Sequence, residues 1–234
     1  MRCLELFAGT GSIGRAFERL GWEVVSLDID PKCEPTHVAD IRDWDYRVYP
    51  RGYFDFVWAS PVCQHYSVAR TTGGPRDLLS ADRLVRRTLD VVDHFGCHYA
   101  FENPQSGLLK TRAIVKGLRF FDTSYCRWGY PYRKTTRIWS NLELCLRKPC
   151  SPGDPCSAMV GKRHPMTAQQ GRRSDAGDTN NRCSQRELYR IPDGLCDAIA
   201  GAANLAVEQS DEPTTGAPAS APVRQAQDEL RRSS

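Results

Sequence analysis

Two side chains in this sequence could carry out covalent chemistry on a bound molecule. Cys63 stands just beyond an apolar run, residues 54–59, and Glu102 directly follows a second one, residues 99–101. A cysteine thiolate is a strong nucleophile, and a partly buried carboxyl group has a raised pKa that suits proton transfer near neutral pH. The alternative interpretations are an unreactive cysteine that fills a core and an exposed acid at a strand end.

The elements that must position these two residues are buried β-strands. Both apolar runs contain aromatic residues and end at polar residues or proline, which is typical of strands. In an open α/β sheet, ligands bind at the carboxyl ends of the strands. We therefore expect the two strands to be neighbours, with Cys63 and Glu102 facing one pocket.

A glycine-rich turn near the start of the chain has the composition of a nucleotide-binding loop. A strand expected over residues 2–7 leads into residues 8–14, and a helix follows that ends at Gly21. Glycines let the backbone approach a ligand closely, and the helix amides can bind polar groups. A second strand, residues 23–27, leads to Asp28, whose carboxylate could accept hydrogen bonds from both ribose hydroxyls. This pattern suits NAD and S-adenosylmethionine alike, and a purely structural turn is the alternative.

A segment rich in cysteine, proline and glycine begins near residue 144. It contains Cys145, Cys150, Cys156 and His164, separated by four, five and seven residues. Three thiolates and one imidazole suit tetrahedral zinc, and a segment with few large apolar residues needs another source of stability. The sequence therefore allows a structural zinc site, with reduced, unligated thiols as the alternative.

The composition suits one α/β domain with a small appendage, since the chain has 234 residues of which 40% are hydrophobic. Its net charge of +4 permits a polyanionic partner. Ten cysteines would suggest disulfides in a secreted protein, but the first residues already form a strand pattern and leave no room for a signal peptide. We expect reduced thiols and a cytoplasmic monomer. No apolar run approaches the roughly 18 residues of a membrane span.

Taken in order, these motifs resemble those of the DNA cytosine-C5 methyltransferases. Residues 60–67 are similar to that family's Pro-Cys loop, whose cysteine is the nucleophile, although Val62 replaces a proline. Residues 102–104 resemble its Glu-Asn-Val motif, with Pro104 in place of valine. The other resembling segments are 4–12 (cofactor turn), 38–41 (adenine contact), 127–137 (basic motif) and 188–203 (last helix).

The resemblance implies an α/β fold with a Rossmann-like sheet that binds S-adenosyl-L-methionine, and a small cysteine-rich recognition insert. It implies that Cys63 adds to C6 of a cytosine flipped out of double-stranded DNA, while Glu102 engages N3 and C5 receives the methyl group. Arg133 and Arg137 are the expected catalytic cations, and Lys134 is the alternative. The residues expected to contact the cofactor are Phe7, Ala8, Gly9, Thr10, Gly11, Ser12, Asp28, Ile29, Asp40, Ile41, Ser60 and Pro61.

The expected division of the chain follows from the same motifs. Residues 1–140 form the catalytic domain, 141–187 the recognition segment, 188–207 a returning helix and 208–234 a disordered tail. Because the recognition segment is short, we expect a target of roughly two to four base pairs. Its candidate base-contacting residues are Arg163, Gln169, Gln170, Arg172, Arg173 and Asn180.

Three other functions remain open at the level of sequence. The tRNA-modifying branch of the same family shares these motifs, and an inactive nucleic-acid-binding protein could keep the fold. An NAD-linked oxidoreductase is the third, because the glycine motif alone does not distinguish NAD from S-adenosylmethionine.

Overall fold

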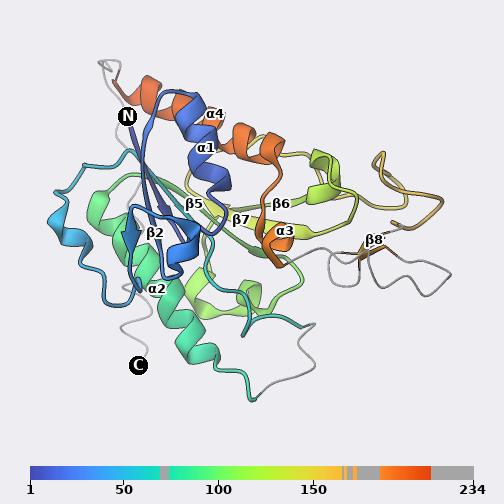
Figure 1. Cartoon of the computed structure of the whole chain (residues 1–234). Helices are drawn as coiled ribbons and strands as arrows, with labels where there is room; N and C mark the ends of the chain where they lie inside the picture. Colours follow the sequence, from blue (N-terminus) through green and yellow to red (C-terminus); the bar gives the residue numbers. More distant parts are fainter. Residues whose placement is uncertain (69–73, 165, 168–170, 173–184, 212–234) are drawn as a thin grey trace.

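The computed structural model describes residues 1–68, 74–164, 166–167, 171–172 and 185–211 (Figure 1). Its strands are β1 Arg2–Leu6, β2 Glu23–Asp28, β3 His37–Val38, β4 Phe56–Ala59, β5 His98–Pro104, β6 Phe120–Ser124, β7 Thr135–Ser140, β8 Met166–Thr167 and β9 Gly171–Arg172. Its α-helices are α1 Ser12–Arg19, α2 Leu78–Phe95, α3 Gln185–Tyr189 and α4 Asp193–Asp211. Among the short 3-10 turns, η5 Tyr125–Trp128 bears on the sites below.

Strands β1 to β7 form one sheet in the order β3-β2-β1-β4-β5-β7-β6. The five strands β1 to β5 all run parallel to one another. Strand β7 runs antiparallel to both of its neighbours, β5 and β6. In the β4–β5 register Ala59 lies opposite Phe101, so Cys63 follows the carboxyl end of β4 and Glu102 lies in the last half of the adjacent strand β5. The predicted α/β fold with a Rossmann-like sheet is confirmed.

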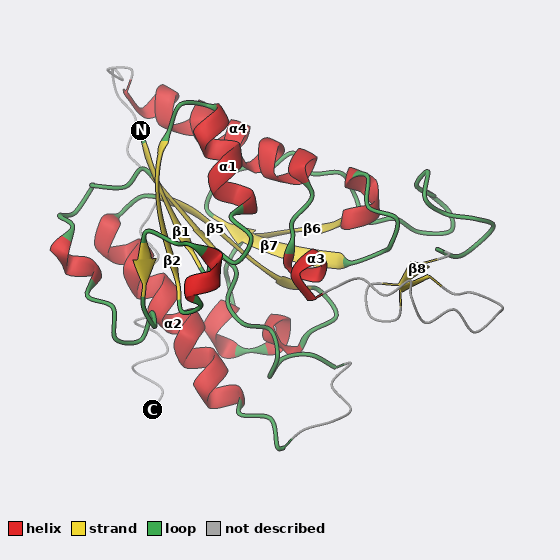
Figure 2. Cartoon of the chain, in the orientation of Figure 1, coloured by secondary structure: helices red, strands yellow, loops and turns green. Residues whose placement is uncertain are grey.

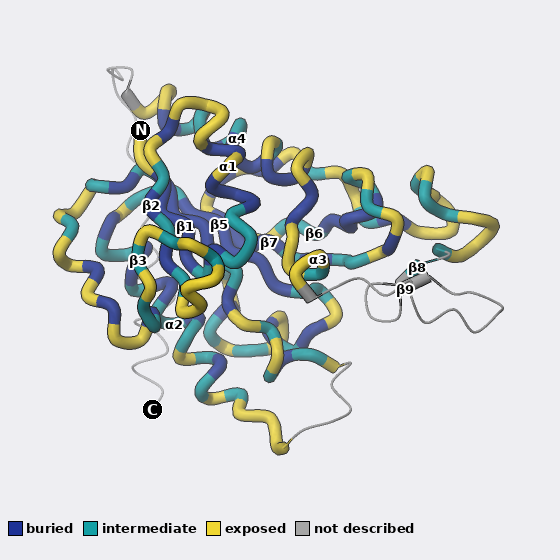
Figure 3. Tube along the Cα trace, viewed as in Figure 1, coloured by how far each residue is buried: buried dark blue, intermediate teal, exposed yellow. Residues whose placement is uncertain are grey.

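Helices cover both faces of this sheet (Figures 1 and 2). On one face, α1 and α4 pack together through Ile13, Phe17, Leu195 and Ile199, against Phe56 of β4. On the other, the apolar face of α2, including Val85, Leu89 and Val92, packs against the sheet. The central strands are thereby buried on both sides (Figure 3), which explains why they are continuously apolar in sequence.

The carboxyl-terminal helix differs from its expected range of 188–207. It is two helices, α3 and α4, separated by a short break at residues 190–192. Proline disfavours a helical conformation in the residue before it and lacks an amide hydrogen, so the chain changes direction there before α4 starts at Asp193. Helix α4 continues to Asp211, so residues 208–211 belong to it rather than to the expected tail.

The segment after β7 leaves the sheet as a long loop and projects beyond β6 and β7 (Figure 2). It is largely exposed (Figure 3). At its end β8 pairs with β9, and Met166 of β8 also forms a bridge with Tyr132 just before β7. Within the described ranges, no helix has the length and apolar character needed to cross a membrane.

Candidate active site

A cavity of about 1190 Å³ opens at the carboxyl ends of β1, β2, β4 and β5. Both expected catalytic residues, Cys63 and Glu102, line it. It is also lined by the expected cofactor residues Phe7, Ala8, Gly9, Thr10, Ser12, Asp28, Ile29, Asp40, Ile41, Ser60 and Pro61. The structure therefore brings the glycine turn and the cysteine loop into one space.

The glycine turn is held to the end of β2 by backbone and side-chain hydrogen bonds. Gly9 has a φ of 53° and donates its amide to Asp28 Oδ2 at 2.8 Å. Gly11 has a φ of 63°, precedes α1 and donates its amide to the Ala8 carbonyl at 2.8 Å. Of the expected cofactor residues, Gly11 does not line the cavity. Its role is to turn the chain into α1 through a left-handed conformation that other residues adopt at a cost.

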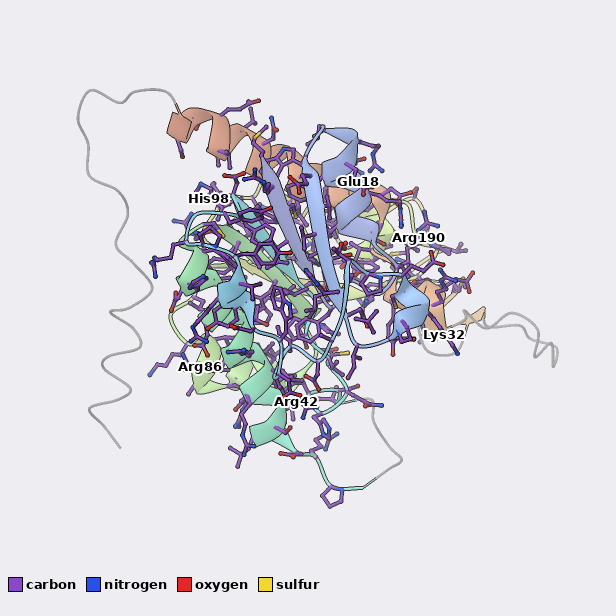
Figure 4. All side chains as sticks on the ribbon, turned by 60° about the vertical axis from the view of Figure 1, so that its left-hand side comes forward. Glu18, Lys32, Arg42, Arg86, His98 and Arg190 are labelled. Atoms are coloured by element: carbon purple, nitrogen blue, oxygen red, sulfur yellow. The ribbon has the colours of Figure 1, made fainter. Side chains whose placement is uncertain are left out.

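The acids at the ends of β2 and β3 have different surroundings. Asp28 accepts amide hydrogen bonds from Gly9 and, at 2.9 Å, from Asp30, so its carboxylate is fixed beside the cavity. Asp40 is paired with Arg42, whose hydrogen bonds lower the pKa of that carboxyl. Arg42 and Lys32 both line the cavity. They lie near the carboxyl ends of the parallel strands (Figure 4). An adenosine-type ligand fits this arrangement, because a fixed carboxylate suits ribose hydroxyls and Ile41 supplies apolar surface.

Glu5 also lines the cavity, and the sequence reasoning gave it no role. It is 3% exposed near the carboxyl end of β1, and its Oε1 accepts a hydrogen bond from the Ile13 amide at 3.2 Å. Burial raises its pKa to about 7, against the opposing hydrogen bonds from Gly14 and Ile13. A Cβ added at Gly14 would come within 2.6 Å of Glu5 Oε2, so a larger residue there would displace the Glu5 carboxyl. The available signal was an acid inside an otherwise apolar strand.

The environment of Cys63 favours the protonated form of its sulfur. The side chain is half-buried, and the loop turns back through a hydrogen bond from the Tyr66 amide to the Cys63 carbonyl at 3.0 Å. Burial raises the pKa of the thiol, the charge of Glu102 raises it further, and Lys134 opposes both. Glu102 is only 7% exposed and accepts a hydrogen bond from the Thr136 hydroxyl.

Asn103 fixes the cysteine loop and was also missed. It is 1% exposed, and its side-chain amide donates to the Pro61 carbonyl at 2.9 Å. Its Oδ1 is buried and has no hydrogen-bond partner within the described residues. This contact joins β5 directly to the loop that carries Cys63. A polar residue at the end of a buried strand was the signal for it.

The structure places Lys134, rather than Arg133 or Arg137, at the cavity. Lys134 Nζ lies 3.2 Å from the Leu188 carbonyl and 4.5 Å from the centre of the Tyr125 ring. Arg133 is exposed and does not line the cavity.

Arg137 does not line the cavity either. It sits directly opposite Asp122 in the β6–β7 register, and two 2.8 Å hydrogen bonds join their side chains. Its guanidinium is therefore engaged in a structural ion pair.

The expected metal set changes by one residue. Cys150, Cys156 and His164 do lie together, but Cys126 of η5 joins them and Cys145 is exposed outside the cluster. The expected set was chosen from residues close together in sequence, but the loop after β7 folds back onto η5 and so brings Cys126 into the cluster.

Among the candidate base-contacting residues, Arg163 is exposed. Those whose side chains lie outside the described residues are Gln169, Gln170, Arg172, Arg173 and Asn180.

Comparison with known sequences gives a viral relative over most of the chain. A protein of Frog virus 3 (isolate Goorha), named "Probable DNA (cytosine-5)-methyltransferase", is 30% identical over 216 residues. The alignment covers 83% of this chain and 96% of the viral protein. No family model matches the sequence.

Several solved structures are similar to parts of this chain. A "putative DNA modification methyltransferase encoded within prophage" of E. coli aligns with a TM-score of 0.45 at 16% identity, covering 62% of this chain and 49% of its own. The Entamoeba histolytica methyltransferase EhMeth gives 0.46 at 15% identity, covering 63% and 56%. The S. pombe Dnmt2 methyltransferase gives 0.42 at 17% identity, covering 64% and 52%. The aligned part is thus about half of each of these longer chains.

Proposed function

Because the chain belongs to the DNA (cytosine-5)-methyltransferase family, we propose that it transfers a methyl group from S-adenosyl-L-methionine to C5 of a cytosine in double-stranded DNA. The observation that carries this proposal is the meeting of Cys63, Glu102 and Lys134 in the cavity that the glycine turn also lines. A nucleophile, an acid and a cation then surround the space where a base would react. The name of the viral relative supports DNA as the substrate.

The residues that would hold the cofactor come from the ends of β1 and β2 and from residues 39–42 after β3. Gly9 allows close approach of the backbone, Asp28 would accept the ribose hydroxyls, and Phe7 and Ile41 would contact the adenine. When bound, S-adenosylmethionine supplies an electrophilic methyl group, and its sulfur keeps the electron pair of the broken sulfur–carbon bond.

Cys63 would open the reaction, because cytosine C5 is by itself a poor nucleophile. After the thiol loses its proton to solvent, the sulfur forms a bond to C6 and the C5–C6 double-bond electrons become available at C5. Glu102, held by Thr136, would donate a hydrogen bond or proton to N3 and so balance the charge. Once C5 carries the methyl group, its proton leaves to water and the electrons of the C5–H bond restore the C5–C6 double bond. N3 gives back its proton to Glu102, and the sulfur–C6 bond breaks. The electron pair of that bond returns to Cys63.

The base must leave the double helix for this attack, because C6 is not reachable from Cys63 in stacked DNA. The cavity would accept a flipped base beside the cysteine loop. Lys32 and Arg186 also line it, and their positive charges would attract the phosphate backbone.

The experiment that tests the function is methyl transfer from labelled S-adenosylmethionine to DNA and, in parallel, to tRNA. We expect label in DNA at C5 of cytosine, none in tRNA, and loss of activity in Cys63→Ala. Cys145→Ser is the matched control, since Cys145 is exposed and away from the cavity. DNA containing 5-fluorocytosine cannot lose its C5 substituent, so it should remain joined to Cys63 in mass spectrometry. Methyl transfer that persists in Cys63→Ala would exclude the covalent mechanism, and label in tRNA alone would reassign the substrate.

A second test concerns Lys134. Its charge lowers the pKa of Cys63 against burial and Glu102, so Lys134→Met should slow alkylation of Cys63 by iodoacetamide at pH 8, whereas Arg137→Met should not. The single-turnover rate should rise from about pH 7 to about pH 9 as the thiolate fraction grows. Equal alkylation rates in the two variants would show that Lys134 does not act on the sulfur.

A further inference from the structure

Four side chains able to bind a metal ion meet where the loop after β7 contacts η5. They are Cys126 of η5, Cys150 and Cys156 of the loop after β7, and His164 before β8. Their ligand atoms all lie within 4.8 Å of one another, with His164 Nε2 at 3.2 Å from Cys156 Sγ and 3.8 Å from Cys150 Sγ. Zinc bonds of about 2.0 to 2.3 Å place the ligand atoms of a tetrahedral site about 3.5 to 3.8 Å apart. The observed separations approach that geometry.

Apolar packing does not account for this meeting. Cys126 and Cys150 are buried, but no residue from 151 to 164 is buried. That stretch is instead arranged as small turns, closed by backbone pairs between Ser151 and Asp154 and between Val160 and Arg163. A segment with so little core needs another source of order, and a metal ion supplies it in many small domains.

Polar contacts bring the loop against η5 at the same place. Arg127, adjacent to Cys126, donates to the Asp154 carbonyl at 2.6 Å and forms an ion pair with the Asp154 side chain. Arg147 donates to the Arg127 carbonyl at 2.6 Å.

We propose that Cys126, Cys150, Cys156 and His164 bind one structural zinc ion. Thiolate and imidazole ligands select zinc over magnesium or calcium, which prefer oxygen. Four protein ligands complete a tetrahedral shell and leave no position for water or substrate, so the ion would stabilise structure rather than take part in the reaction. The proposal does not depend on the proposed methyltransferase activity.

The position of Cys126 gives the ion a second consequence. Cys126 belongs to the catalytic domain and lies in the same connection between β6 and β7 as Lys134, while the other three ligands belong to the expected recognition segment. Met166, two residues after His164, forms a β-bridge with Tyr132. Tyr132 is buried and precedes Lys134 by two residues. Zinc would therefore fix the recognition segment to the strand connection that carries Lys134 into the cavity.

Metal analysis of the full chain, purified without added metal, tests the site directly. We expect about one zinc ion per chain by mass spectrometry. Cys126→Ser should lose it and Cys145→Ser should keep it. This pair separates the ligand set of the structure from the set expected from sequence spacing. His164→Ala should also lose the ion, whereas His164→Cys, which restores a fourth ligand, should retain it.

Two further measurements keep the test decisive if Cys126→Ser folds poorly, because Cys126 is buried. His164 is only half-buried, so the two His164 variants should fold, and circular dichroism checks this. Cobalt added to the metal-free protein should give the thiolate charge-transfer absorption of a tetrahedral site. Absence of both zinc and that absorption in folded protein would overturn the proposal. A disulfide between any two of the three cysteines, or zinc retained in folded His164→Ala, would overturn it as well.

Discussion

The buried carboxyl of Glu5 should make the stability of this protein depend on pH in an unusual direction. Its pKa rises from an ordinary value of 4.5 to about 7 in the folded state, chiefly because it is buried. Between these two values the unfolded chain loses the Glu5 proton while the folded chain keeps it. The folded state therefore binds more protons, and this contribution to stability falls as pH rises through the window.

The size of the effect follows from the two pKa values. Each pH unit between them corresponds to about 1.4 kcal/mol, so the full difference is about 3 kcal/mol above pH 7. From pH 5.5 to pH 8 the linkage relation gives a loss of about 2 kcal/mol. Glu5→Gln removes this titration but leaves the strand and turn in place. The glutamine amide group would hydrogen-bond to the Ile13 and Gly14 amides less well than the carboxylate does. The resulting loss of stability does not vary with pH.

Urea denaturation of both proteins at several pH values between 5.5 and 8 measures the difference. The unfolding free energy of the wild-type protein, relative to Glu5→Gln, should fall by about 2 kcal/mol across that range. The comparison between pH values cancels the constant cost of the substitution. Parallel pH profiles for the two proteins would refute the reasoning, because they would show that Glu5 titrates alike in the folded and unfolded states.

Three substitutions test other parts of the site. Asp28→Ala should weaken S-adenosylmethionine binding in calorimetry by about 1 to 3 kcal/mol, because ribose hydroxyls would lose their acceptor; unchanged affinity would contradict this. Asn103→Ala should slow single-turnover methyl transfer roughly 10- to 100-fold, since the Pro61 carbonyl loses its donor and the cysteine loop shifts. An equal loss of cofactor affinity would indicate general disruption instead. Arg137→Met should lower the unfolding free energy by about 1 to 3 kcal/mol by stranding Asp122, while the turnover rate stays within about twofold. A folded but inactive variant would return Arg137 to the active site.

Local pattern was sufficient to locate the cysteine loop and the acid opposite it. Strands β4 and β5 are buried on both faces, so their apolar runs are unbroken and end sharply where Cys63 and Glu102 follow. Adjacent parallel strands have their carboxyl ends at the same edge of the sheet, so the residues at the ends of β4 and β5 were expected to line one pocket. The glycine turn was predictable for a different reason: glycine adopts the left-handed conformations of Gly9 and Gly11 without the cost that a Cβ brings.

Pairings between distant segments were beyond the reach of sequence pattern. Arg137 is engaged by Asp122 because the β6–β7 register puts them opposite each other, and no local feature of the basic motif sets that register. Cys126 precedes Cys150 by 24 residues, and only the folding of the loop back onto η5 joins them. The burial of Glu5 likewise depends on α1 closing over β1.

The return of the chain after α3 has a consequence for protein synthesis. Tyr189 and Ile191 line the cofactor cavity, and the Ile191 amide lies 3.4 Å from Ser12 Oγ, 179 positions away in sequence. At about 5 to 20 residues per second, a ribosome adds that much chain in about 10 to 40 s. During that interval the glycine turn exists without its closing wall, and Phe17 lacks the cover of α4. A nascent or truncated chain ending before Arg190 would thus contain all the motif residues of the amino-terminal half and still lack a complete binding site.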